Sequence, residues 1–204
     1  MMELASLVDP KHTTILCMEM QRGVVGDLAR FSGPGDAVAE LGIIDRCAAL
    51  FEGARAAGIR ILHCTAAFRP DKIGSYRNMP FVSALMEDPE HIPVDSPAAE
   101  VLPALHHPDD LESQRLHGIS PFTDTPVNAY LKSLETRTII ATGVSLNRGI
   151  IGISIEGVNR GYSVVIPRDA VAGFPTAYGE QVLQNTLDGL TTLTRVDALL
   201  RIWA

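Results

Sequence analysis

The sequence is poor in cysteine and in positive charge, and each shortage excludes a class of protein. Its three cysteines, Cys17, Cys47 and Cys64, are an odd number without Cys-x-x-Cys spacing, which argues against a disulfide framework and against a structural zinc site. Lys and Arg number 17 against 24 Asp and Glu, which gives a net charge of −7. Such an acidic chain is poorly suited to nucleic acid or to an anionic membrane, so we expect neither as a partner.

Long apolar segments are missing as well. No uninterrupted apolar run reaches the length needed to cross a bilayer. The first ten residues carry Glu3 and Asp9 and no basic cluster, unlike a signal peptide, so we expect a cytoplasmic protein with reduced thiols. With 46% hydrophobic and 20% charged residues, the 204-residue chain can form one domain with a complete core.

Short apolar runs alternate with segments of helical periodicity. The runs predict strands at residues 13–18, 59–64, 138–142 and 162–166, and we expect further short strands near 111–115 and at 193–196. The periodic segments predict helices at 36–57, 125–134, 147–159 and 176–190, and Asn147 is expected to cap the third, with Ile151, Ile155 and Val158 on one face. This alternation predicts one α/β domain over residues 1–204, with three α/β/α layers around a mostly parallel six-stranded sheet in a Rossmann-like arrangement.

Residues 68–117 differ from the rest of the chain, because they contain many prolines and little periodicity. We expect loops here, with a short helix near 81–86. Long irregular segments in a compact domain commonly form a lid or an oligomer contact.

Glu19 follows the first predicted strand directly. In sheets of this kind, ligands bind beyond the carboxyl ends of the strands. A carboxylate that is partly buried there is costly unless it is bonded or lines a ligand site, so Glu19 is a candidate general acid or base. The alternative is a carboxylate that caps a nearby helix or pairs with Arg22 or Arg69.

Three further features lie at the same predicted edge of the sheet. His117, in a segment interrupted by glycine and proline, could exchange protons near neutral pH or could be a surface loop residue. The turn at 143–149 places helix N–H groups on the ligand side, as an anion site or as an ordinary turn. Cys64 ends the second strand without a helix N-terminus of its own, which favours a buried, inert thiol over a reactive one.

Four motifs occur in order along the chain. They are Met18-Glu19-Met20-Gln21, then Ser120-Pro121-Phe122 with Thr125, then Thr142-Gly143-Val144-Ser145-Leu146-Asn147, and last the segment from Gly161-Tyr162 to Asp169-Ala170. Together they resemble the isochorismatase-like (cysteine hydrolase) superfamily, which includes nicotinamidases, N-carbamoyl amidohydrolases and isochorismatases. The resemblance covers essentially the whole chain. It implies the isochorismatase-like hydrolase fold and an active site at the strand ends.

The sequence departs from this family at its catalytic positions. Amidase members use an Asp, a Lys and a Cys, which correspond here to Glu19, Leu116 and Gly149, so the covalent nucleophile and the amine that helps activate it are both missing. The metal-binding Asp and His of nicotinamidases correspond to Ala67 and Arg69, so we expect no metal and no cofactor. Isochorismatases also resemble this chain in having Gly at the nucleophile position, and they cleave a vinyl ether by protonation from the strand-end acid.

We therefore weigh three hypotheses. The first is a cysteine-independent hydrolase of a small anionic metabolite, in which Glu19 is the acid or base, His117 assists, and Arg69 or Arg148 binds the anion. The second is a catalytically inactive family member that binds a ligand or a partner, and the third moves the thiol chemistry to Cys64. The binding positions expected around this pocket are Gln21, Arg22, Phe68, Arg69, Phe122, Ser145, Arg148 and Gly149.

Two further expectations come from the resemblance. The family often carries a cis peptide that does not involve proline at the strand-turn, which places it here between Val144 and Ser145. Family members also self-associate, so we expect a homo-oligomer with contacts through the proline-rich segment or through residues 199–203, which end in Trp203.

Overall fold

The protein, described here by a computed structural model, is defined for residues 3–204, so Met1 and Met2 of the N-terminal segment lie outside the description. The strands are β1 (Thr13–Met18), β2 (Arg60–Ala66), β3 (Leu111–Arg115), β4 (Thr138–Val144), β5 (Ser163–Pro167), β6 (Val171–Ala172) and β7 (Thr192–Thr194). The α-helices are α1 (Leu4–Leu7), α2 (Arg22–Val25), α3 (Ser32–Glu40), α4 (Ile43–Ala56), α5 (Pro80–Leu85), α6 (Val127–Ser133), α7 (Ile151–Asn159), α8 (Thr176–Val182) and α9 (Val196–Trp203). None of the helices in residues 3–204 combines the length and apolarity that a membrane crossing requires.

The strands form one sheet in which every pairing is parallel, in the order β3-β2-β1-β4-β5-β7. In the centre of the sheet, Cys17 lies opposite His63 of β2 and Thr142 of β4. The predicted α/β fold with its parallel sheet is confirmed. The seventh strand, β6, pairs with the end of β4. It was not predicted, because two residues carry no periodicity.

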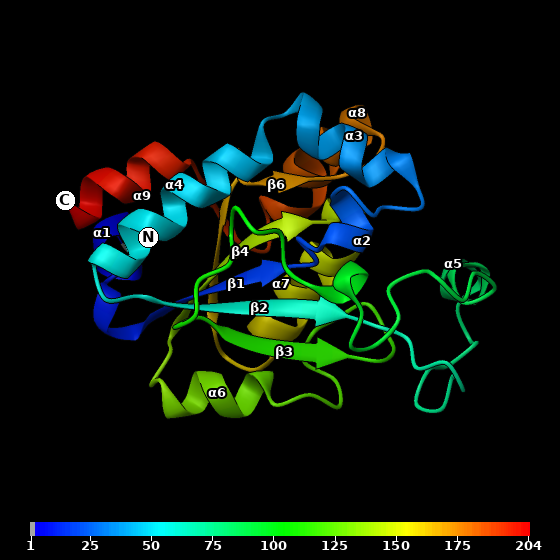
Figure 1. Ribbon diagram of the computed structural model, residues 1–204. Coiled ribbons are helices and arrows are strands. Elements are labelled where there is room, and N and C mark those ends of the chain that lie inside the picture. The colour runs from blue at the N-terminus through cyan, green and yellow to red at the C-terminus, as the bar shows by residue number, and fades with distance from the viewer. Residues whose placement is uncertain (1–2) are drawn as a thin grey trace.

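Two cores cover the two faces of the sheet (Figure 1). Successive strand residues point to opposite faces, so Ile15 and Cys17 join the core beneath α4 and α9, whereas Leu16 and Met18 join the core beneath α6 and α7. All four side chains are buried. The near-continuous apolar run of β1 is therefore the consequence of burial on both sides, as expected for a central parallel strand.

The helix predicted at 36–57 is wrong in its boundaries, because the chain forms two helices there. α3 ends at Glu40, and α4 begins after Gly42, whose φ of 63° is the left-handed conformation that glycine adopts readily. The apolar periodicity continues across the break, so the sequence pattern alone did not show it.

The helix predicted at 147–159 differs in its start. A π-helical turn, η3 (Leu146–Ile150), precedes α7, and Asn147 lies inside that turn and donates from Nδ2 to the Phe174 carbonyl instead of capping. The buried face contains Ile153, whereas Ile155 and Val158, which the spacing places on one face, are 45% and 41% exposed. An i→i+5 turn changes the angular position of every later residue.

The C-terminal part of the chain holds two smaller differences. The helix predicted at 176–190 consists of α8 followed by a π-helical turn, η4 (Leu183–Leu187), and Leu190 is exposed. Residues 199–203, expected as an oligomer contact, lie in α9, which packs on α4. Leu199 is fully buried, and the Trp203 indole N–H donates to the Val8 carbonyl at 3.0 Å. Self-association stays a prediction.

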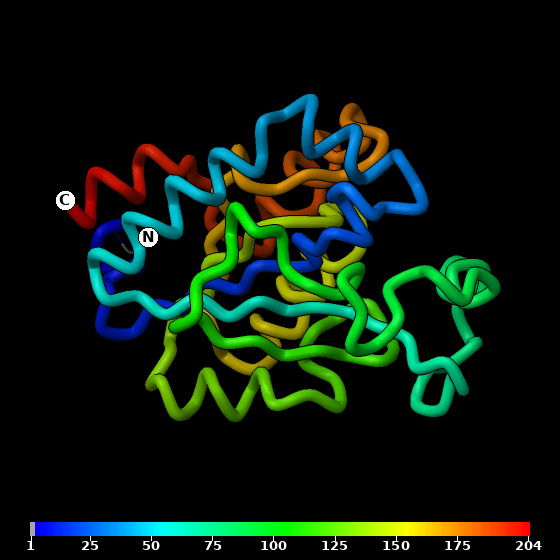
Figure 2. Tube along the Cα trace, viewed as in Figure 1, coloured from blue at the N-terminus to red at the C-terminus, as the bar shows by residue number. Residues whose placement is uncertain are grey.

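The proline-rich segment leaves the sheet after β2 and returns before β3. Figure 2 shows the part around α5 projecting beyond the carboxyl ends of these strands. Gln21 anchors the base of the segment: its Nε2 donates to the carbonyls of Ala66 and Ala99, and its Oε1 accepts from the Ala66 N–H. The segment thus forms one wall above the strand ends.

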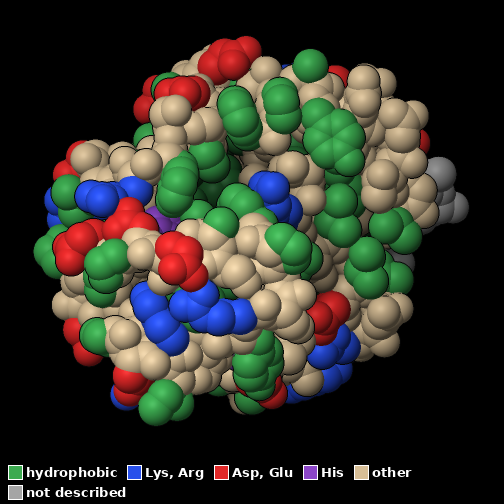
Figure 3. All heavy atoms as spheres, turned by 90° about the vertical axis from the view of Figure 1, so that its right-hand side faces the viewer, with side chains coloured by type: hydrophobic (Ala, Val, Ile, Leu, Met, Phe, Trp, Pro, Cys, Tyr) green, Lys and Arg blue, Asp and Glu red, His purple; other side chains and the backbone are tan. Residues whose placement is uncertain are grey.

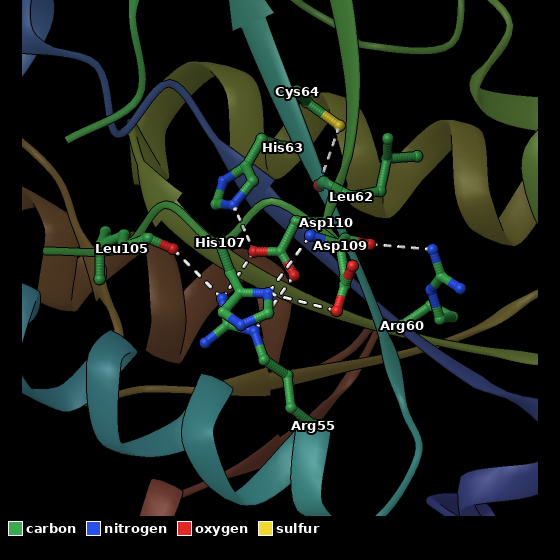
Figure 4. A network of polar contacts seen from close by, with 9 residues as sticks. All are labelled: Arg55, Arg60, Leu62, His63, Cys64, Leu105, His107, Asp109 and Asp110. Carbon is green, nitrogen blue, oxygen red and sulfur yellow. Dashed lines mark hydrogen bonds and ion pairs between the residues drawn. The ribbon is translucent and has the colours of Figure 1, made fainter. Parts of the chain in front are cut away.

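A buried polar network ties α4 to the other end of the sheet (Figure 4). His63 on β2 contacts Asp110 at 3.1 Å, and Arg55 on α4 donates to Asp110 at 2.6 Å. Burial opposes protonation of His63, but its contacts with Asp110 and Cys17 prevail and raise its pKa to about 9. Burial opposes ionisation of Asp110, but His63 and Arg55 hold its pKa below the usual range. None of these three residues lines the cavity at the strand ends that is described below.

Candidate active site

Glu19 lies at the carboxyl edge of the sheet, as its position after β1 predicts. Its backbone is held in the left-handed region, with φ 50°, by a hydrogen bond from its N–H to the Cys64 carbonyl at 3.0 Å. The side chain is 19% exposed. A non-glycine residue in this conformation is uncommon and directs the carboxylate out of the strand's regular alternation.

Arg115 is the partner of Glu19. It is the last residue of β3, its side chain is 7% exposed, and its Nη2 donates to Glu19 Oε1. The guanidinium also donates to the carbonyls of Gly118 and Thr65, at 3.3 and 3.4 Å. The pair is therefore fixed from several sides, since a guanidinium offers five donors in a rigid fork.

Sequence reasoning missed Arg115 and named neither its partner nor its role. It expected Glu19 to pair, if at all, with Arg22 or Arg69, but these residues pair with Asp27 and Asp71 on the surface. The signal that could have found Arg115 is its place at the end of a predicted parallel strand, one residue before Leu116. In the sequence, Arg115 directly precedes Leu116, the residue that the resemblance places at the family's Lys position.

The peptide between Val144 and Ser145 is cis, as expected from the resemblance. Gly149 follows in η3 and is buried. A Cβ atom at this position would lie 2.8 Å from Cε and 2.9 Å from Cγ of Met18. The space beside Gly149 is thus filled by the Met18 side chain rather than left empty.

A cavity of about 690 Å³ opens at this edge of the sheet. Figure 3 shows the hollow on this face, surrounded by hydrophobic side chains with a Lys or Arg side chain at its margin. Six of the predicted site residues line it: Glu19, Phe68, His117, Ser145, Arg148 and Gly149. The volume lies within the range of small-molecule sites in proteins.

The other four predicted binding residues are not among those that line the cavity. Gln21 is fully buried and bonds to backbone, Phe122 is buried and stacks on Tyr162, and Arg22 and Arg69 form the surface pairs described above. Of the two arginines suggested to bind the anion, Arg148 lines the cavity and Arg69 does not.

His117 contacts Asp124 at 3.1 Å and lies against the Tyr76 ring, with the ring centroids 4.3 Å apart. Its side chain is 11% exposed and lines the cavity. It therefore stands at the site, but with a carboxylate already bound to its Nε2.

The cysteine side chains do not reach the cavity, although the Cys64 backbone carbonyl accepts the Glu19 N–H. Within residues 3–204 all three are buried, and the cavity wall contains none of them. Burial raises the pKa of the Cys64 thiol well above its usual range. A thiol held in its neutral form is a poor nucleophile, which weighs against the hypothesis that Cys64 carries the chemistry.

Comparison with known proteins places the chain in a family. Residues 13–198 match the family described as Isochorismatase domain. The protein belongs to the isochorismatase family. No curated protein matches the chain.

Solved structures share the fold of this isochorismatase family member. A cysteine hydrolase from Pseudomonas syringae pv. phaseolicola 1448A is 22% identical with a TM-score of 0.82, over 97% of this chain and 94% of that one. An isochorismatase-like hydrolase from Alkaliphilus metalliredigens is 23% identical with a TM-score of 0.77, over 95% and 98%. N-carbamoylsarcosine amidase from Thermoplasma acidophilum is 16% identical with a TM-score of 0.70, over 91% and 97%. At these identities the likeness shows the fold alone.

Proposed function

We propose that this family member is a hydrolase of a small anionic metabolite and that Glu19 performs the acid/base chemistry without a cysteine nucleophile. The observation that carries the proposal is that Glu19 is the single carboxylate among the described residues lining the cavity. It is fixed there by Arg115 and by the backbone bond to Cys64. A preorganised carboxylate beside a ligand-sized cavity is the arrangement that proton transfer to or from a substrate requires.

In this proposal Glu19 acts as the general base. Its carboxylate accepts the proton of a water molecule as the water oxygen attacks the substrate. The same proton then passes from Glu19 to the leaving group, which restores the carboxylate. His117, already bound to Asp124, would assist by orienting the substrate or the water rather than by carrying the proton.

Exchange of one carboxylate tests this role. Glu19→Gln is expected to lower kcat/KM at least 100-fold on whichever substrate a panel of amides, N-carbamoyl compounds and isochorismate reveals, because general base catalysis contributes about 10²–10⁴-fold. Glu112→Gln, on an exposed residue of β3, is the matched control and should leave the rate unchanged. Equal rates in Glu19→Gln and the unaltered protein would remove Glu19 from the mechanism.

The second candidate function is ligand binding without turnover. Two observations favour it: Glu19 is already satisfied by Arg115, and Met18 fills the space beside Gly149. It predicts thermal stabilisation by panel compounds with no product from any of them. Product formed by the purified protein, and lost in Glu19→Gln, would exclude it.

A further inference from the structure

The cavity wall contains cations whose charge is already balanced. Arg30 pairs with Asp88 at 2.6 Å, and Arg115 pairs with Glu19. A guanidinium that is bound to a carboxylate is a weak site for a second anion, because the two charges largely cancel.

Arg148 is different. Across residues 3–204, its guanidinium has no carboxylate within ion-pair distance and no hydrogen-bond acceptor, and it lies over the Phe81 ring with Cζ 4.1 Å from the ring centroid. A contact with the ring face leaves the N–H donors of the guanidinium free for a ligand. Lys72, whose Nζ lies 5.5 Å from the Phe68 centroid, is not among the residues that line the cavity.

The two histidines of the wall add no uncompensated charge. His117 is bound to Asp124. His91 is 5% exposed, and burial lowers its pKa, so the ring is neutral at pH 7. Its Nδ1 is buried without a hydrogen-bond partner, and its ring packs edge-on against Phe31 at 5.4 Å. The wall therefore presents one unbalanced positive charge, that of Arg148.

The remainder of the wall is mostly apolar. Large apolar side chains come from the segment above the strand ends and from other parts of the wall: Phe31, Phe68, Phe81, Leu85, Ile92 and Phe174. Such a surface favours a ligand with an aromatic or branched-alkyl body. It disfavours a polyhydroxylated or phosphorylated one, whose polar groups would be buried without partners.

We propose that the cavity binds an apolar monocarboxylate, with its carboxylate on Arg148 and its apolar body against the phenylalanine rings. The inference rests on the proposed function, since it names the substrate class of the same site. It makes Arg148 and Phe81 the residues that determine specificity, and Glu19 the residue that acts on the bond.

Calorimetric titration with phenylacetate, its neutral isostere phenylacetamide, and acetate tests the inference. Phenylacetate should bind the unaltered protein at least tenfold more tightly than phenylacetamide, because only the acid can form a charge-assisted bond to Arg148. It should also bind at least tenfold more tightly than acetate, which lacks the apolar body. Equal binding of the acid and the amide, equal binding of acetate, or no binding of phenylacetate would overturn the inference.

Variants locate the charge. Arg148→Gln should remove the preference for acid over amide, Arg148→Lys should keep it, and Arg201→Gln, on an exposed arginine of α9, should leave it unchanged. If the preference for the acid survives in Arg148→Gln, Arg148 does not bind the carboxylate. If Arg148→Gln does not fold, the comparison of Arg148→Lys with the unaltered protein tests the same contact, and loss of the preference in Arg148→Lys contradicts it. In Glu19→Gln, phenylacetate should still bind. If Glu19→Gln binds phenylacetate and turns over the panel substrate at an unchanged rate, the catalytic proposal alone is refuted. If Glu19→Gln loses turnover but the unaltered protein does not prefer phenylacetate over phenylacetamide, the specificity proposal alone is refuted.

Discussion

The ion pair of Glu19 and Arg115 is the residue-scale feature on which the site depends. Both side chains are largely buried, and Arg115 is held by two carbonyls in addition to the carboxylate. Removing one member of a buried pair leaves an uncompensated charge, whereas removing both does not. The pair is therefore expected to show strong energetic coupling.

A double-mutant cycle measures that coupling. Arg115→Gln should lower the free energy of unfolding by about 3 kcal/mol, since it leaves Glu19 charged and unpaired. The double variant Glu19→Gln/Arg115→Gln should lose less than the sum of the two single variants. Urea denaturation gives all four values, and strict additivity would show that the two side chains do not interact in solution.

Gly149 is the second residue whose surroundings matter. Gly149→Ala would bring a methyl group within 3 Å of the Met18 side chain, so we expect a loss of about 1–3 kcal/mol from overpacking. Gly189→Ala is the matched control, because no atom lies within 4 Å of the added Cβ and its φ is not positive. Thermal or urea unfolding checks both variants. A Gly149→Ala protein as stable as the control would mean that Met18 moves aside freely.

The sequence predicted the position of Glu19 better than its environment. Its place after a buried strand and the rule for parallel sheets were enough to put it at the cavity. The sequence could not predict the pairing of Glu19 with Arg115, because the two residues are 96 positions apart and β2 lies between their strands in the sheet. Long-range side-chain pairs of this kind follow from the three-dimensional register, which the local pattern does not encode.

At the scale of elements, the network of His63, Asp110 and Arg55 joins α4 to β2 and to the chain before β3. The pKa of His63 is raised to about 9 in the folded protein. A raised histidine pKa contributes stability that is fully present below the unfolded value near 6.5 and is lost as pH rises through about 9. The lowered pKa of Asp110 acts at low pH. Its contribution to the free energy of unfolding is complete above the usual pKa of an aspartate and is lost as pH falls through the lowered pKa of the folded protein.

Stability measured against pH tests the network. Between pH 6.5 and pH 9.5 the free energy of unfolding should fall by about 3 kcal/mol through His63 alone. His63→Gln should be less stable at neutral pH and should lose most of this fall, whereas His106→Gln, on an exposed histidine, should keep it. Urea denaturation at several pH values gives the comparison, and an unchanged slope in His63→Gln would show that another group titrates.

Element boundaries show where sequence periodicity is insufficient. The central strands β1 and β4 occur where their short apolar runs are buried on both sides, whereas β3 and β7, at the edges of the sheet, are only partly buried. The predicted helices were less accurate where glycine or a π-helical turn interrupts a continuous apolar repeat, as at Gly42 and at Leu146–Ile150. Such interruptions change the phase of a helix without changing its composition, so Ile155 and Val158 face outward although their spacing suggests the core.

At the scale of the whole molecule, the C-terminal helix closes the fold against the N-terminal segment. α9 packs on α4, and Trp203 reaches the Val8 carbonyl across 195 positions of sequence. The indole is partly buried by residues of its own chain. An apolar C-terminal segment, which by sequence alone suggested a contact between subunits, is thus accounted for within one chain.

Two substitutions at Trp203 separate packing from hydrogen bonding. Trp203→Phe keeps an aromatic ring but removes the N–H, so it should cost about 1 kcal/mol, the typical net value of one hydrogen bond. Trp203→Ala also removes the ring and should cost about 3 kcal/mol, the lower end for an aromatic residue in a core, because the side chain is only partly buried. Light scattering alongside urea denaturation adds the decisive readout. If α9 serves the fold of a single chain, both variants lose stability without a change in molecular mass, whereas a change in mass at unaltered stability would return this segment to a subunit interface.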